Sequence, residues 1–184
     1  MENKKIIFLA ILFQVLILAG MFVKALHPLL TGQEIELKTV TKDPRDFFSG
    51  DYVILNYEFN TLDLNETPND LDTLRMYGYG DALYLELTKK GDFFEPVGLW
   101  QNQKDNENIF MRVIVEHSYE GNSNYKVIYL KAGIEKYFTE SQNAKMLEEL
   151  TSWASRDAFE VSVSVMVSSS GVARIKKINY KEKK

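Results

Sequence analysis

Residue types that could carry out chemistry are few in this sequence, and Asp51 is the first of them. It follows Gly50 at the start of an alternating run, where its carboxylate could bind a cation or accept a proton. An aspartate at the junction of a turn and a strand usually accepts hydrogen bonds from backbone N–H groups instead. We therefore interpret Asp51 as structural, with Arg45 across the preceding turn as a residue that could pair with it.

Glu135 is the second carboxylate of interest. Glu135 and Tyr137 alternate on a strand-like run and could orient the segment that follows. A pair of catalytic carboxylates lies roughly 5 to 9.5 Å apart in glycosidases, and the sequence fixes no second carboxylate near Glu135. Two hypotheses stay open: a binding module without catalysis, and a cell-envelope hydrolase or transferase that uses carboxylates near Asp51 and Glu135. They differ in whether Asp51, Arg45 and Glu135 converge in a pocket or bind backbone amides.

Residues that the sequence lacks exclude several kinds of site. The absence of cysteine removes disulfides, thiolate metal sites and lipidated cysteine. His27 and His117 are the only histidines and have no metal-binding spacing, so we predict neither a metal site nor a cofactor. Ser49 lacks the methionine and proline that follow a signal peptidase-like serine, and no phosphate-binding loop or G-x-S-x-G elbow occurs. The net charge of −4 argues against nucleic acid as a partner.

A strand with a two-residue period must position Asp51. One face of the run carries Val53, Leu55, Tyr57 and Phe59, and the other carries Tyr52, Ile54, Asn56 and Glu58. This alternation predicts a half-buried strand from Asp51 to Phe59, with Tyr52 and Tyr57 on opposite faces and one of them in the core. The preceding Asp43-Pro44-Arg45-Asp46 predicts a turn, and Gly50 can supply a positive φ before the strand.

The same stretch resembles a known family. Residues 50–57, Gly-Asp-Tyr-Val-Ile-Leu-Asn-Tyr, match the pattern G-D-Y-x-x-L-x-Y of the GDYXXLXY proteins. Residues 43–46 and 133–138 are also similar to that family, and the resemblance covers most of the chain beyond Lys24. It implies a membrane-anchored bacterial protein, often accompanied by a polytopic membrane protein, and it supplies no catalytic residue. The candidate site residues are the motif positions Gly50, Asp51, Tyr52, Leu55 and Tyr57, with Asp43, Arg45, Glu135 and Tyr137 in support.

An apolar run from Ile6 to Val23, broken only by Gln14, predicts a membrane anchor. At about 1.5 Å per residue it matches the roughly 30 Å of a bilayer's hydrocarbon core. Lys4 and Lys5 before the run favour a cytoplasmic N-terminus. We therefore predict a cytoplasmic stub and anchor over 1–26 and an extracytoplasmic domain over 27–184, in a single-pass protein of the inner cell membrane. A cleaved signal peptide is the alternative, although no clean small-x-small site closes the run.

The rest of the chain reads as short alternating segments. Strands are predicted at 34–41, 51–59, 82–88, 108–116, 125–131, 159–167 and 172–179, with hairpins at 119–124 and 168–171. The even positions of 159–167 carry Glu160, Ser162, Ser164 and Met166, so we expect that face to be at least partly wet. An amphipathic helix is predicted from about Glu140 to Ser155, and 62–81 as a loop or short helix. The predicted fold is mainly β: an antiparallel meander or barrel-like sheet with one packed helix.

Overall fold

The computed structural model describes residues 2–40, 52–72, 75, 77–120, 126–139 and 158–182. The predictions for Asp43, Arg45, Gly50 and Asp51 lie outside the described residues. The predicted helix from about Glu140 to Ser155 and residues 121–124 of the predicted hairpin at 119–124 also lie outside them.

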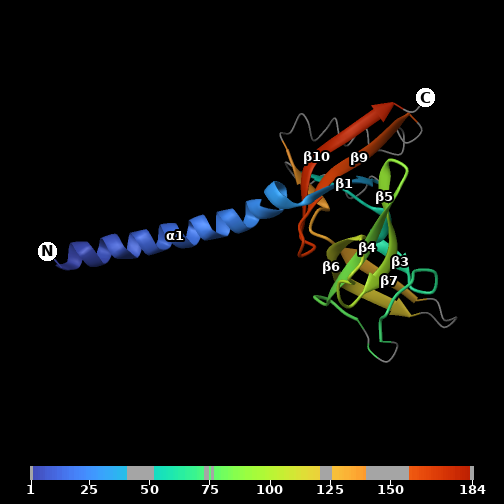
Figure 1. Cartoon of the computed structure of the whole chain (residues 1–184), viewed down its shortest axis with the longest axis horizontal. Coiled ribbons are helices and arrows are strands. Elements are labelled where there is room, and N and C mark those ends of the chain that lie inside the picture. The colour runs from blue at the N-terminus through green and yellow to red at the C-terminus, as the bar shows by residue number, and fades with distance from the viewer. Residues whose placement is uncertain are drawn as a thin grey trace.

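The N-terminal run forms one long helix, α1 (Glu2–Thr31), that projects from the β-rich part of the chain (Figure 1). At about 1.5 Å per residue its 30 residues measure roughly 45 Å. Residues 4–25 are exposed, although most of them are apolar. An exposed apolar surface of this kind is unfavourable in water and favourable in lipid. By its length and composition, α1 is long and apolar enough to cross a membrane.

Among the described residues beyond α1, the strands form three antiparallel sheets. The first has the order β1-β9-β10, with β1 (Gln33–Lys38), β9 (Phe159–Val167) and β10 (Ala173–Glu182). The second pairs β2 (Tyr52–Ile54) with β8 (Lys136–Phe138). The third has the order β3-β7-β6-β4-β5, with β3 (Thr61–Asp63), β7 (Lys126–Lys131), β6 (Ile109–Glu120), β4 (Ala82–Lys90) and β5 (Phe93–Trp100). The mainly β prediction is confirmed.

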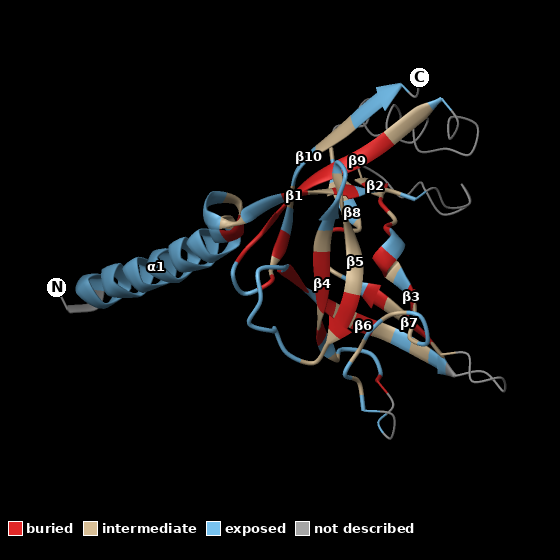
Figure 2. Ribbon diagram, turned by 45° about the vertical axis from the view of Figure 1, so that its right-hand side comes forward, coloured by how far each residue is buried: buried red, intermediate tan, exposed pale blue. Residues whose placement is uncertain are grey.

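The sheets curl round one core, which Figure 2 marks by the buried segments on their inner sides. Every second residue of each long strand contributes its side chain to this core, because successive side chains of a strand point to opposite faces. Fully buried members from four strands are Ile35, Leu85, Leu87, Met111, Val113, Val163 and Val165. Alternating hydrophobic positions of β4, β6 and β9 therefore point inward.

The predicted long strand at 51–59 is wrong in its extent. Within it only Tyr52–Ile54 pairs as β2, and a 3₁₀ turn occupies Glu58–Asn60. Its faces are nevertheless as predicted, since Val53, Leu55, Tyr57 and Phe59 are all buried.

Strand β5, which contains Pro96 and Gly98, was not predicted from the sequence. Proline cannot donate to a ladder and is tolerated at sheet edges, which is where β5 lies in its sheet. A register shift opposite Glu86 and Leu87 accommodates the irregular stretch. The loop prediction for 62–81 holds for described residues 64–81, while Leu62 and Asp63 belong to β3.

The outer face of β9 is drier than expected. Ser162 and Ser164 are only 8% and 6% exposed. Their hydroxyls donate to the carboxylate of Glu36 on the neighbouring β1, which also accepts a hydrogen bond from Asn179 on β10. Paired polar groups can be buried at little cost, so the serines need no water.

Candidate functional site

Tyr57, the last motif residue, lies in the core. It is 2% exposed, its ring stacks on Phe59 with 5.1 Å between centroids, and its hydroxyl donates to the Ile134 carbonyl oxygen at 2.9 Å. Burial raises the pKa of the Tyr57 phenol, and the nearby Glu135 carboxylate raises it further. The hydroxyl therefore stays protonated and acts as a fixed donor.

The segment around Tyr57 connects the three sheets. Val40, just after β1, donates its N–H to the Asn56 carbonyl at 2.8 Å. The Leu55 N–H donates to the Glu135 carbonyl at 2.8 Å, next to β8. The Asn60 side chain donates to the Leu130 carbonyl of β7 at 2.9 Å. Because one short stretch bonds to all three sheets, the motif positions Leu55 and Tyr57 lie in a structural junction.

Glu135 closes the turn between β7 and β8. Its two carboxylate oxygens accept the backbone N–H groups of Ala132 at 2.6 Å and Gly133 at 2.9 Å. Gly133 has φ of 79°, a conformation that L side chains rarely adopt, so the turn needs glycine there. A carboxylate with both oxygens bound to backbone amides favours a structural role for Glu135 over a catalytic one. Tyr137 stands opposite Val53 and is partly buried.

The Glu135→Ala variant should lower the free energy of unfolding by about 1–3 kcal/mol, because two backbone N–H groups lose their acceptor. Glu135→Gln should lose less, since its amide oxygen can still accept one of them. Chemical denaturation of the detergent-solubilised protein measures both. Equal stability of the parent and Glu135→Ala would contradict this role.

Tyr52, on the other face of the motif, is partly exposed. Its ring lies 5.5 Å from that of Phe138, and the Lys136 ammonium lies 4.9 Å from the Tyr52 centroid. Phe138 is 72% exposed. Tyr52 and Tyr57 thus have the opposite orientations that the two-residue period indicates, and Tyr57 is the core residue.

A pocket of about 250 Å³, here called the loop pocket, lies where the 64–77 loop crosses the ends of β6 and β7. Its lining is Leu64, Asn65, Asn69, Leu71, Asp72, Arg75, Tyr77, Ser118, Tyr119, Lys126, Val127 and Ile128. Aliphatic and aromatic walls with a few polar groups are typical of sites for small ligands. The pocket could not be predicted from the sequence, because its residues come from three separate segments.

Hydrogen bonds brace the loop pocket on two sides. Arg75 pairs with Asp81 at 2.6 Å, and its guanidinium lies over the ring of Tyr77. The backbone carbonyl of Tyr77 accepts a hydrogen bond from the Ser118 hydroxyl. At the other end, Asp70 accepts the Gln101 N–H at 2.8 Å. These contacts tie Asp70, Arg75 and Tyr77 to residues in or next to the five-stranded sheet, so they help to hold the pocket lining in place.

Glu86 on β4 is a buried carboxylate that holds a second loop, residues 101–108. It is 7% exposed and accepts hydrogen bonds from the Trp100 indole and from the side-chain amides of Asn106 at 2.8 Å and Asn108 at 2.7 Å. Burial acts to raise the pKa of Glu86, but the hydrogen bonds and the Lys104 charge together lower it below its usual 4.5.

The Glu86→Gln variant should be destabilised by about 1.5–3 kcal/mol at neutral pH, because a charged acceptor of three hydrogen bonds is lost. A lowered folded pKa adds stability that is present above the unfolded pKa of 4.5 and is lost as the pH falls through the folded pKa. The stability difference between parent and variant should therefore shrink below about pH 4.5. Denaturation curves from pH 7 downward test this, and a difference that does not change with pH would contradict it.

In the part of the chain that the structure describes, no group of three or more histidine, aspartate or glutamate side chains could hold a metal ion. The described motif residues Tyr52, Leu55 and Tyr57 lie beside Glu135 and Tyr137 at the sheet junction, whereas the loop pocket lies at the ends of β6 and β7. The motif and the loop pocket are therefore separate features.

In its described residues the protein is β-rich, with three antiparallel sheets that follow one long apolar helix. The model of the GDYXXLXY protein family matches residues 14–178, so the chain belongs to that family, as the motif indicates. Comparisons with curated proteins and with solved structures give no match.

Proposed function

We propose that this protein is a single-pass membrane protein whose β-domain works outside the cytoplasm as a binding module. The observation that carries the proposal is α1, whose residues 4–25 are exposed and mostly apolar and which leads into β1 through Gly32 alone. A bilayer is the solvent that such a helix requires. Lys4 and Lys5 at its start support a cytoplasmic N-terminus.

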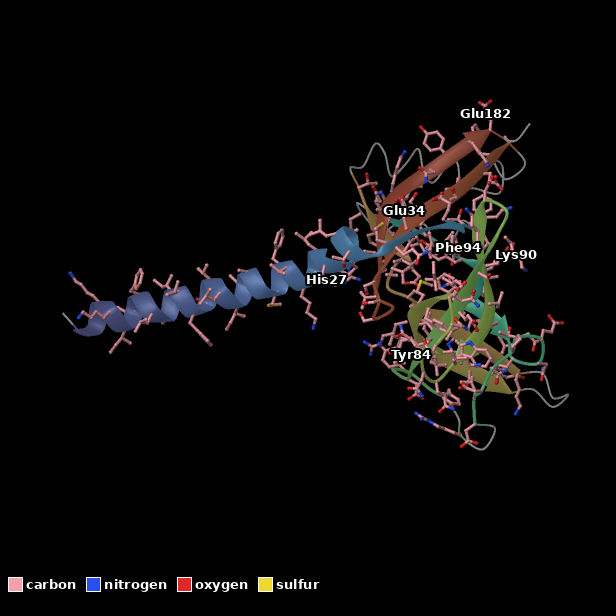
Figure 3. All side chains as sticks on the ribbon, viewed as in Figure 1. His27, Glu34, Tyr84, Lys90, Phe94 and Glu182 are labelled. Carbon is pink, nitrogen blue, oxygen red and sulfur yellow. The ribbon has the colours of Figure 1, made fainter. Side chains whose placement is uncertain are left out.

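The orientation can be tested with single cysteines because the chain has none of its own. A membrane-impermeant maleimide applied to right-side-out vesicles should label Lys90→Cys and should label Asn3→Cys only after the membrane is permeabilised. Lys90 is a good reporter because Figure 3 shows it on the side of the β-domain away from α1. Labelling with the two positions reversed would refute the extracytoplasmic placement.

The loop pocket is the part of the domain best suited to bind a small molecule or a short peptide side chain. Leu64, Leu71 and Val127 offer an apolar surface, and Tyr77 adds an aromatic wall. Pockets that combine apolar walls with a few polar groups bury the apolar part of a ligand and orient its polar part. We therefore expect a ligand with a small apolar or aromatic body and one polar group.

Saturation-transfer NMR with a library of small aromatic acids and amides tests this, using the protein in nanodiscs. Binding should be lost in Leu71→Trp, which fills the pocket, and kept in Tyr180→Trp, which changes an exposed tyrosine on β10. Fragments that bind the parent and Leu71→Trp equally would place binding elsewhere. Absence of any fragment binding would refute the loop pocket as a ligand site.

A further inference from the structure

The length of α1 sets the distance of the β-domain from the bilayer. Its roughly 45 Å equals a whole bilayer with headgroups, about 40–45 Å, and exceeds the hydrocarbon core of about 30 Å. If Ile6 to Val23 occupies the core, then Lys24 to Thr31 crosses the headgroup layer. The first strand, which begins at Gln33, then starts at the outer surface of the headgroups.

The junction between α1 and the β-domain is tightly packed. Pro28 is buried, and the Gly32 N–H donates to the Pro28 carbonyl at 2.9 Å. A Cβ on Gly32 would lie 2.4 Å from the Pro28 oxygen and 3.0 Å from the Val167 carbonyl group. With no spare room and no linker, the domain keeps one side toward the membrane. Figure 1 shows the turn between β9 and β10 beside the end of α1.

That side of the domain carries aromatic and basic side chains. Tyr84 on β4 stands opposite both Trp100 on β5 and Arg112 on β6, so the three share the outer face of the sheet. The Lys104 ammonium lies over the Trp100 ring, and both Lys104 and Arg112 are exposed. Figure 3 shows Tyr84 on the side of the domain toward α1. Tyrosine, tryptophan and basic residues are the types enriched at membrane interfaces.

A hollow of about 330 Å³, lined by polar residues together with Ile109, Phe110 and Val167, joins this face to the helix end. Thr31 and Gln33 line it on one side, and Gln103, Lys104 and Ser169 on the other. Side-chain amides, a hydroxyl and an ammonium suit the phosphate and glycerol oxygens of lipid headgroups. The hydrogen bonds from Asn106 and Asn108 to Glu86 hold the 101–108 loop, which supplies Gln103 and Lys104.

We propose that the base surface, defined as Tyr84, Trp100, Gln103, Lys104, Arg112 and Ser169, rests on the phospholipid headgroups around α1, with Lys104 and Arg112 facing their phosphates. This inference depends on the proposed function, because it requires α1 to span the bilayer. The 101–108 loop also contains Asp105 and Glu107, so the contact is a local one to phosphate rather than general attraction to a positive surface. Headgroup contact would fix the orientation of the domain relative to the bilayer.

Nitroxide quenching of single fluorophores tests the proposal on the full-length protein in phosphatidylcholine and phosphatidylglycerol vesicles. A label at Ser169→Cys or Gln103→Cys should be quenched by a nitroxide on the lipid headgroup. A label at Lys90→Cys should not be quenched. Replacing Lys104 and Arg112 by glutamine should lower quenching at Ser169→Cys about twofold or more, because these two side chains supply the charge attraction to the lipid phosphates. The matched Lys89→Gln, Lys90→Gln variant should leave it unchanged.

A label at Leu16→Cys separates this inference from the proposal that supports it. Quenching of that label by a nitroxide in the acyl chain reports that α1 lies in the bilayer. If Leu16→Cys is quenched and Ser169→Cys is not, the headgroup contact is refuted and the anchor stands. If Leu16→Cys is not quenched, both the anchor and the headgroup contact are refuted.

Discussion

The Tyr57→Phe variant is expected to lose about 1–3 kcal/mol of its free energy of unfolding although it removes a single oxygen atom. The lost hydroxyl donates to the Ile134 carbonyl within the core, and that carbonyl would stay buried without this donor. Tyr57→Ala should lose about 3–5 kcal/mol, because it also leaves a cavity beside Phe59. Such losses would establish that the last motif residue maintains the junction of the three sheets.

Chemical denaturation of the detergent-solubilised protein, followed by tryptophan fluorescence, measures these differences. Tyr180→Phe is the matched control, since Tyr180 is 52% exposed and the change should stay within about 0.5 kcal/mol. If Tyr57→Phe is as stable as Tyr180→Phe, the hydrogen bond to Ile134 does not stabilise the fold.

The sequence predicted the faces of the motif segment better than its hydrogen bonding. Tyr57 has φ of −126° and ψ of 156°, which is extended backbone, and it forms only an isolated bridge to Thr39. Side chains alternate wherever the backbone is extended, whether or not a ladder forms. The alternation therefore placed Leu55 and Tyr57 in the core, while the strand itself ends at Ile54.

Contacts between distant segments could not be predicted in the same way. Glu36 accepts hydrogen bonds from serines more than 120 residues away, and nothing local to Glu36 indicates them. Glu135 was a candidate because it is a carboxylate that alternates with Tyr137 on a strand-like run, but its bonds to Ala132 and Gly133 became visible only in the turn's geometry. The loop pocket likewise depends on how the 64–77 loop crosses β6 and β7.

The Leu16→Arg, Ile17→Arg double variant is expected to leave the membrane fraction. The two positions lie at the middle of α1 and are 62% and 48% exposed, so no contact with the β-domain compensates the change. An arginine at the centre of a membrane helix costs roughly 2.5–3.5 kcal/mol, and the lost leucine and isoleucine favour insertion, which together gives about 6–8 kcal/mol. A cost of that size exceeds the free energy that a single helix gains when it inserts into the bilayer.

Carbonate washing followed by centrifugation measures the effect. The parent and the Leu16→Ala, Ile17→Ala control should stay in the pellet, and the arginine variant should appear in the supernatant. Its circular dichroism should keep the β signal, because the changed residues lie far along α1 from the sheets (Figure 1). An arginine variant that resists carbonate extraction would contradict the assignment of α1 as the anchor.

The mass of the parent in the same pellet distinguishes an uncleaved anchor from a signal peptide. An anchor keeps residues 1–26, whereas cleavage after the apolar run would release a shorter chain that lacks Lys4 and Lys5. Intact-protein mass spectrometry should give the full-length chain. The packing of Pro28 and Gly32 against β9 supports this result, because the end of α1 is already part of the folded domain. A shortened parent chain in the supernatant would show instead that the helix is a signal peptide that is removed during export.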